Sequence, residues 1–379
     1  MGSITRNTIV GPDGVDISYL EALPAGAERI LGTRIEEDPQ AMTALPAGGV
    51  PTDRPPVFLV HGWPEQANSW RHQLPALAAA GWHVVAPDLR GFGHSGCPDD
   101  VAEYRIDRVA GDLLALQDHL GVANAVLVGH DWGSMVVWLT ALLHPERTAA
   151  VVGMSVPYAR FPLPPTQLFD MMRGDRFFYI SYFQPIGVAE AELERDVEQT
   201  LRKVYWSASG PAMAQAESFG LRPDHPMEGT EFLQTMAEPP GAPDLDAMPW
   251  FTDDDMTDAV AAYHRTGFHG GLSYYRSFDA NTAFTADLGD DRMTMPSAFL
   301  TGTLDPVRGM GAPGPPAGAE RIRGTRIEEA PQATAGEEAQ AGMLPGFRGN
   351  TYIDGAGHWV QQEAPDETNA FLLKFLGAL

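Results

Sequence analysis

The segment VGHDWGS (residues 128–134) places an aspartate where a nucleophile would be expected. An apolar run ends at this segment and a helical pattern follows at once, which is the strand–turn–helix setting in which hydrolases present a serine. A serine there needs a neighbouring base, whereas a carboxylate with a reference pKa of about 3.9 is already an anion. It is too weak to attack an amide but adequate for a carbon bearing a good leaving group or belonging to a strained ring. Asp131 therefore predicts an alkyl-enzyme ester.

Hydrolysis of such an ester needs an activated water and donors for the oxyanion. The order nucleophile, acid, histidine that belongs to this kind of turn directs the search downstream. Asp305 in FLTGTLDPV and His358 in DGAGHWVQQE each follow a predicted strand, so we expect them to form a base and its orienting acid. The main-chain N–H groups of Trp63, in HGWP, and Trp132 are the candidate oxyanion donors.

Each of these residues also has an ordinary structural interpretation. Asp131 could cap a helix, Asp305 could start a turn, and His358 is one of 11 histidines. Ser134 is a rival nucleophile, but it lies one turn into the helix. Four elements at four predicted strand ends favour the catalytic interpretation. The sequence has no HExxH, no paired CxxC and no phosphate-binding glycine loop, so we expect neither a metal nor a nucleotide cofactor.

The elements that must position these residues alternate between strand and helix. This rhythm, with nearly continuous apolar strands, predicts an α/β fold with a mostly parallel sheet covered on both faces. The predicted strands are residues 56–62, 83–88, 125–130, 149–156, 296–302 and 350–355, and the predicted helices are residues 69–81, 105–121, 135–144 and 367–376.

The rhythm stops between residues 157 and 292. This stretch is rich in aromatic residues and methionine, shows short helical pieces and has no strand alternation. We therefore predict a helical cap, or lid, of residues 157–292 inserted into a core of residues 1–156 and 293–379. The core carries two predicted loop insertions, near 24–49 and 311–342.

Both predicted insertions contain the same sequence. Residues 24–41 and 316–333 match at 16 of 18 positions. Two copies are too few for a solenoid. Because each copy contains glycine, proline and charges of both signs, we expect each to be a surface loop without a catalytic role.

The composition of the chain limits the classes of partner that we expect it to bind. The net charge of −25 argues against nucleic acid and anionic membranes. A single cysteine, Cys97, the lack of a signal peptide and the lack of a long apolar run together predict a cytoplasmic protein that does not insert into membranes. A homodimer stays an open alternative.

Several motifs resemble one known family. HGWPEQANSWRHQLPALAAAGWHVVAPDLRGFGHS, VGHDWGSMVVW, SYFQPIGVAEAELERD, GFHGGLSYYRS and DGAGHWVQQEAPDETN are similar to the epoxide hydrolases of the α/β-hydrolase fold. The resemblance covers residues 50–310 and 345–379. It implies an aspartate nucleophile at Asp131, a relay acid at Asp305 and a histidine at His358.

The resemblance also implies two cap tyrosines that hold the epoxide oxygen. By motif these are Tyr179 in FFYISYFQ and Tyr275 in GGLSYYRS, with Tyr182 and Tyr274 as the alternatives. A phenol with a pKa of about 10 can donate to the ring oxygen at neutral pH and release its proton as the ring opens.

We therefore expect a bacterial-type epoxide hydrolase acting on a bulky lipophilic epoxide and water. Two alternatives remain at this point: a haloalkane dehalogenase, which shares the aspartate and the histidine, and a non-catalytic binding protein of the same fold. The sequence departs from the family in having longer segments before HGWP and between Asp305 and His358. The second of these could disturb the alignment of acid and histidine unless it loops out.

Overall fold

The computed structural model describes most of the 379 residues. The described residues are 4–27, 54–215, 221–308, 320–323, 326–329, 340 and 342–379.

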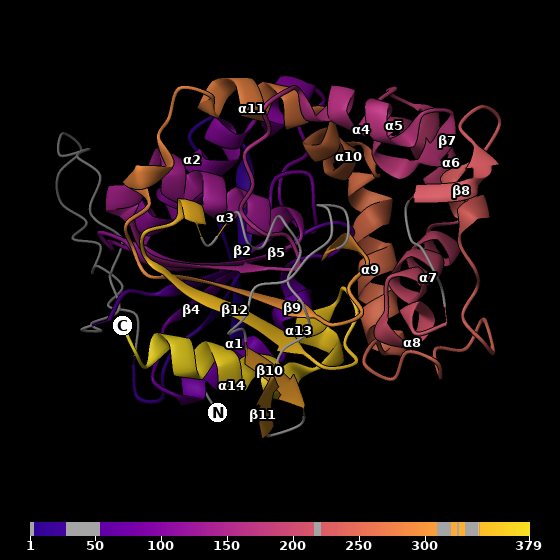
Figure 1. Ribbon diagram of the computed structural model, residues 1–379. Coiled ribbons are helices and arrows are strands. Elements are labelled where there is room, and N and C mark those ends of the chain that lie inside the picture. The colour runs from indigo at the N-terminus through magenta and orange to yellow at the C-terminus, as the bar shows by residue number, and fades with distance from the viewer. Residues whose placement is uncertain are drawn as a thin grey trace, which may run out of the picture.

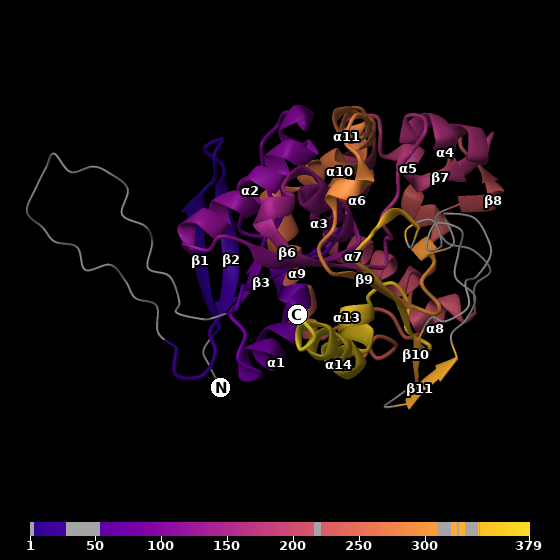
Figure 2. The ribbon, with the colours of Figure 1, turned by 60° about the vertical axis from the view of Figure 1, so that its left-hand side comes forward.

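A sheet of ten strands, in the order β1-β2-β4-β3-β5-β6-β9-β12-β10-β11, forms the centre of the molecule (Figures 1 and 2). Neighbouring strands are parallel from β4 through β10. Toward the two edges of the sheet, the pairs β1–β2, β2–β4 and β10–β11 are antiparallel. The strands are β1 (Ile4–Val10), β2 (Asp16–Ala22), β3 (Val57–Val60), β4 (Val84–Pro87), β5 (Ala125–His130), β6 (Thr148–Met154), β9 (Ser297–Gly302), β10 (Glu320–Arg323), β11 (Arg326–Glu329) and β12 (Phe347–Ile353).

Helices cover both faces of this sheet (Figure 1). The helices α1 (Gln73–Ala79), α13 (Val360–Glu363) and α14 (Pro365–Leu376) lie on one face, and α2 (Ile106–His119) and α3 (Trp132–Leu143) lie on the other. Successive residues of β3 enter opposite cores: Phe58 and Val60 pack with α2 and α3, while Val57 and Leu59 pack with α1 and α14. Both faces are therefore dry, which explains why the central strands are continuous apolar runs.

A block of short helices is inserted between β6 and β9. It contains α4 (Pro165–Arg173), α5 (Tyr179–Tyr182), α6 (Val188–Leu193), α7 (Val197–Ser207), α8 (Gly210–Met213), α9 (Asp253–Thr266), α10 (His269–Arg276) and α11 (Phe278–Thr285). The described residues also contain short 3-10 helices: η1 (Ala67–Trp70), η2 (Val101–Tyr104), η3 (Pro145–Arg147), η4 (Phe232–Thr235) and η5 (Asp290–Arg292).

The expectation that residues 157–292 contain no strand is wrong in one place. Strands β7 (Arg176–Phe178) and β8 (Leu221–Pro226) form a small antiparallel sheet. With three residues β7 is too short to display the alternation on which sequence-based recognition of a strand depends.

The expectation of two loops is wrong for residues 320–323 and 326–329, within the second copy of the duplicated sequence. Residues 320–323 and 326–329 form the antiparallel pair of β10 and β11, and β10 extends the sheet by pairing in parallel with β12. The motif RIRGTRIE alternates single isoleucines with charged residues around a glycine, which is a hairpin pattern. Most of the first copy, from residue 28 to 41, lies outside the described residues.

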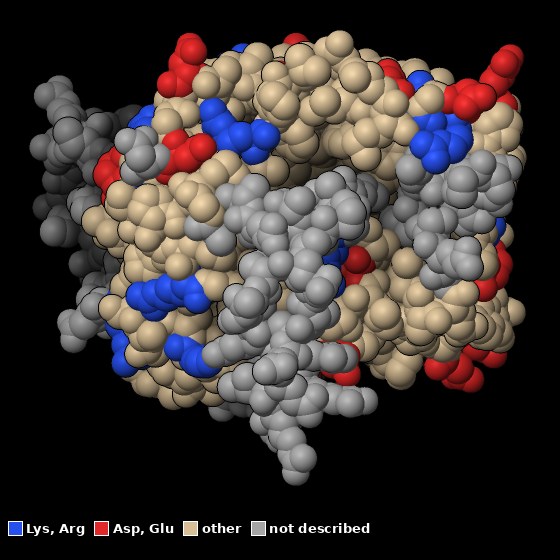
Figure 3. Space-filling view, in the orientation of Figure 1, with Lys and Arg blue, Asp and Glu red and all other residues tan. Residues whose placement is uncertain are grey.

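None of the helices in the described part of the chain combines the length and the apolar character that a bilayer span requires. On the face drawn in Figure 3, acidic and basic side chains are scattered among other residues and do not gather in one patch.

Candidate active site

Asp131 stands at a sharp turn between β5 and α3. Its backbone has φ 54° and ψ −118°, a conformation that costs a non-glycine residue about 1–3 kcal/mol. The turn is tight because the flanking glycines touch neighbouring backbone. A Cβ on Gly129 would lie 2.1 Å from the carbonyl oxygen of Gly133, and one on Gly133 would lie 2.0 Å from that of Val60. These contacts explain why glycines stand on both sides of the aspartate.

The Asp131 carboxylate is buried, with 8% of the residue exposed, and it faces two predicted partners. The main-chain N–H of Trp63 donates to Oδ1 at 2.8 Å. Nε2 of His358 lies 3.4 Å from Oδ2. Trp132, the other predicted donor, is the first residue of α3 and lines the same cavity as Asp131.

His358 and Asp305 meet although 52 residues separate them along the chain. Nδ1 of His358 lies 3.0 Å from Oδ1 of Asp305, so the long intervening segment does not pull the two apart. Asp305 is held in turn by the hydroxyl of Thr301 and the main-chain N–H of Val307, each at 3.0 Å. The structure therefore brings together the predicted nucleophile, histidine and acid.

The charges in this group oppose the effect of burial. Burial alone would lower the pKa of His358, but the anions of Asp305 and Asp131 outweigh it and raise that pKa to about 10. Burial likewise works against ionisation of Asp305, and the neighbouring His358 outweighs it, so the pKa of Asp305 is lowered. With Asp131 ionised, His358 is thus a cation at neutral pH.

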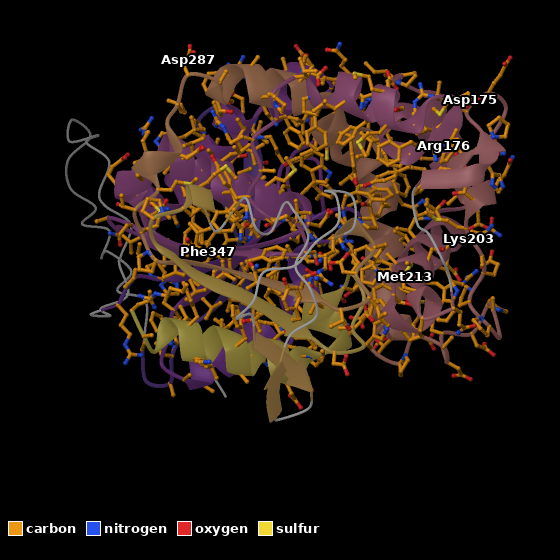
Figure 4. The ribbon with its side chains drawn as sticks, in the orientation of Figure 1. Asp175, Arg176, Lys203, Met213, Asp287 and Phe347 are labelled. Carbon is orange, nitrogen blue, oxygen red and sulfur yellow. The ribbon has the colours of Figure 1, made fainter. Side chains whose placement is uncertain are left out.

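A cavity of about 440 Å³ opens beside Asp131 and contains both favoured tyrosines. Tyr179 comes from the start of α5 and Tyr275 from α10, and their rings lie 5.9 Å apart in a T-shaped arrangement. Figure 4 shows aromatic side chains crowded around α10, above the sheet. Burial raises the pKa of both phenols well above 10, so both are protonated at neutral pH. The other lining residues are mostly apolar and include Met135, Trp138, Leu139, Phe161, Phe169, Ile180 and Phe278.

The alternative tyrosines do not line this cavity. The Tyr274 hydroxyl donates to the carbonyl oxygen of Arg90 at 3.1 Å, within the packing between α10 and the core. The Tyr182 hydroxyl lies beside the Glu192 carboxylate instead. Of the four tyrosines weighed from the sequence, Tyr179 and Tyr275 share the space next to Asp131.

The chain is similar to known proteins both in sequence and in structure. Residues 55–204 match the family model described as alpha/beta hydrolase fold. The chain is 42% identical to epoxide hydrolase A of Mycobacterium tuberculosis over 86% of this chain and 91% of that protein. The crystal structure of epoxide hydrolase A from Mycobacterium thermoresistibile is similar, with a TM-score of 0.77 and 36% identity over 100% of this chain and 99% of that one. An epoxide hydrolase from an endophytic Streptomyces gives a TM-score of 0.79 at 32% identity over 99% and 96% of the two chains.

The chain belongs to the epoxide hydrolases of the α/β-hydrolase fold. This agrees with the fold class and the family predicted from the sequence.

Sequence reasoning missed three residues around the histidine of this epoxide hydrolase. Both ring nitrogens of His130 face acceptors, since Nδ1 lies 2.7 Å from the Glu65 carboxylate and Nε2 lies 2.7 Å from the carbonyl oxygen of His358. The Ser155 hydroxyl donates to that same carbonyl oxygen at 3.0 Å. These contacts fix the backbone of His358. In the sequence, only their proximity to candidate site residues could have indicated a role for Glu65 and His130: Glu65 ends HGWPE, and His130 directly precedes Asp131.

Proposed function

We propose that this protein hydrolyses an epoxide to a vicinal diol through a covalent ester on Asp131. A carboxylate oxygen of Asp131 attacks one ring carbon, and the bond between that carbon and the ring oxygen breaks. The ring oxygen takes a proton from Tyr179 or Tyr275 as it leaves. The proposal is supported by the cavity, where both phenols and the carboxylate face the same space.

The cavity's chemistry favours the role of the tyrosines. Ring opening produces an alkoxide, which is a much stronger base than a phenolate. Because their pKa values are raised, the phenols keep their protons until that alkoxide forms. They can therefore donate hydrogen bonds to the intact epoxide and supply a proton during bond cleavage.

In this proposal the second half-reaction begins with a change of charge. Alkylation turns the Asp131 anion into a neutral ester, which removes one of the anions that raise the pKa of His358. His358 then releases a proton, which replaces the one that the tyrosine gave up and restores the phenol. Neutral His358, oriented by Asp305, takes a proton from water as the water attacks the ester carbonyl carbon. The N–H groups of Trp63 and Trp132 stabilise the oxyanion. The bond between the carbonyl carbon and the ester oxygen then breaks, and the ester oxygen leaves in the diol with the proton of the hydroxyl that water added. Asp131 is again a carboxylate and His358 is again a cation.

The residues between β6 and β9 are in this proposal the cap, or lid, over a core of residues 1–156 and 293–379. The cap supplies both tyrosines and much of the apolar lining, including Phe161, Phe169 and Phe278. Such a lining suits a bulky lipophilic epoxide. Other aromatic residues between β6 and β9, such as Trp206 and Phe251, do not line the cavity and pack within the apolar core.

The tyrosine pair beside Asp131 is the observation on which the choice of reaction rests. A haloalkane dehalogenase would use the same Asp131 and His358 but would need halide-binding N–H donors where the phenols stand. To test this, the protein is incubated with styrene oxide and with a bromoalkane, and diol and bromide are measured. We expect diol and no bromide. Bromide without diol would overturn the proposal, and no product from aryl, terpenoid and fatty-acyl epoxides would favour a binding protein.

A further inference from the structure

The loop that carries His358 lies directly against the backbone of the inserted helices. The main-chain N–H of His358 donates to the carbonyl oxygen of Ala208 at 2.9 Å. The indole N–H of Trp359 donates to the carbonyl oxygen of Tyr205 at 2.7 Å. A Cβ on Gly357 would lie 2.3 Å from the nitrogen of Gly210. The loop and the junction between α7 and α8 thus touch without intervening side chains.

Glu363, at the end of α13, stabilises this contact between the His358 loop and the α7–α8 junction. Its Oε2 accepts hydrogen bonds from the main-chain N–H groups of Gly210 at 2.8 Å and Gly357 at 3.1 Å. Its Oε1 accepts one from the N–H of Trp359 at 3.1 Å. One carboxylate therefore binds the residue before His358, the residue after it and the start of α8. Met213, labelled in Figure 4, marks the other end of α8.

We propose that Glu363 is a positioning residue for the second half-reaction, which holds the His358 loop against the inserted helices so that His358 can activate water. This inference rests on the proposed function. Three N–H donors point at one carboxylate, and hydrogen bonds to an anion are stronger than those to a neutral group. A glutamine in place of Glu363 would turn an NH2 group toward N–H donors, so at least one of these hydrogen bonds would be lost.

Replacing Glu363 should affect only one step of the reaction, the hydrolysis of the ester. Ring opening uses Asp131 and the tyrosines, none of which Glu363 contacts. Breakdown of the ester needs His358 at a defined distance from the attacking water. A small displacement of the histidine therefore slows hydrolysis while leaving alkylation intact.

Glu363 also gives this step a pH dependence. Burial and, to a lesser degree, the charge of Asp305 raise the pKa of Glu363 to about 7, although the three N–H donors oppose the shift. When the pH falls through this value, the Glu363 carboxyl takes up a proton. A protonated Oε2 no longer accepts hydrogen bonds from the N–H groups of both Gly210 and Gly357. Hydrolysis of the ester in the wild-type protein should therefore slow as pH falls below about 7. Titration of His358 also affects this step. Because the Glu363 variants keep His358, its contribution to the pH dependence is the same in the wild type and in the variants.

The test compares Glu363→Gln with two other variants. Glu192→Gln is the matched control, because Glu192 is also buried and also accepts from two main-chain N–H groups, those of Phe232 and Leu233, away from His358. His358→Gln is the reference for a blocked second half-reaction. Steady-state kinetics are measured from pH 5 to 9, and the alkyl-enzyme is followed in single turnovers by mass spectrometry of the intact protein.

For Glu363→Gln we expect kcat to fall about 10- to 100-fold, with kcat/KM within about twofold of wild type because kcat and KM fall together. The ester should accumulate, and the part of the fall in rate below about pH 7 that is due to Glu363 should disappear, which leaves only the part due to His358. If Glu363→Gln fails to fold, Glu363→Asp, which keeps the charge on a shorter side chain, should show the same pattern more weakly. Equal loss of both steps, or ester breakdown at the wild-type rate, would overturn the inference. If His358→Gln accumulated no ester, the proposed function itself would fail.

Discussion

Replacing Tyr179 and Tyr275 together by phenylalanine is expected to remove nearly all ring opening. The cavity beside Asp131 then lacks both phenol hydroxyls, which the proposal assigns as the proton donors to the departing oxygen. We expect kcat/KM for styrene oxide to fall by about 10²- to 10⁴-fold, the usual contribution of a positioned acid. Alkyl-enzyme should not form in single turnovers, since the first chemical step is the one affected.

The tyrosine result needs a control for general damage to the inserted helices. Tyr182→Phe serves, because Tyr182 is on the same helix as Tyr179 but does not line the cavity. It should keep kcat/KM within about threefold of wild type, as expected for a residue outside the machinery. Turnover by the double variant close to that of Tyr182→Phe would show that the ring oxygen receives its proton elsewhere.

The variant His358→Gln is expected to stop the reaction halfway. Asp131 keeps its carboxylate and the tyrosines keep their protons, so the ester should form. The amide of glutamine cannot take a proton from water, and hydrolysis should slow by about 10²- to 10⁴-fold. Mass spectrometry should then find one added substrate mass on the peptide that contains Asp131.

Two comparisons make the trapping result specific. Asp131→Asn combined with His358→Gln should acquire no mass, since the nucleophile is gone. His264→Gln, which changes an exposed histidine on α9, should turn over like wild type and accumulate nothing. Full turnover by His358→Gln would remove this histidine from the mechanism.

Much of the fold could be predicted because the signals are local. The apolar runs of β3, β5 and β6 are buried on both faces, and such runs are read directly from the chain. The turn at Asp131 is equally local, because a glycine on each side of the aspartate is required by the backbone contacts there. Asp305 and His358 followed from the order of residues in this kind of fold, and the structure places them 3.0 Å apart.

Other features depend on contacts that no local pattern contains. The ties of Glu363 to Gly210 and of His130 to Glu65 join residues more than 60 positions apart. The choice between Tyr179 and Tyr182 also needed the structure, since one turn of α5 separates a residue in the cavity from one outside it. The antiparallel pair of β10 and β11 was missed because the charged residues of these edge strands resemble a loop in composition.

The most direct test of the account follows oxygen through a single turnover in water enriched in oxygen-18, with the protein in excess over styrene oxide. If Asp131 forms the ester, the diol released first carries an ordinary oxygen from that carboxylate, and the heavy oxygen appears in the peptide that contains Asp131. Heavy oxygen in the diol of the first turnover, with an unlabelled Asp131, would mean that water opens the ring directly, and the covalent mechanism would be wrong.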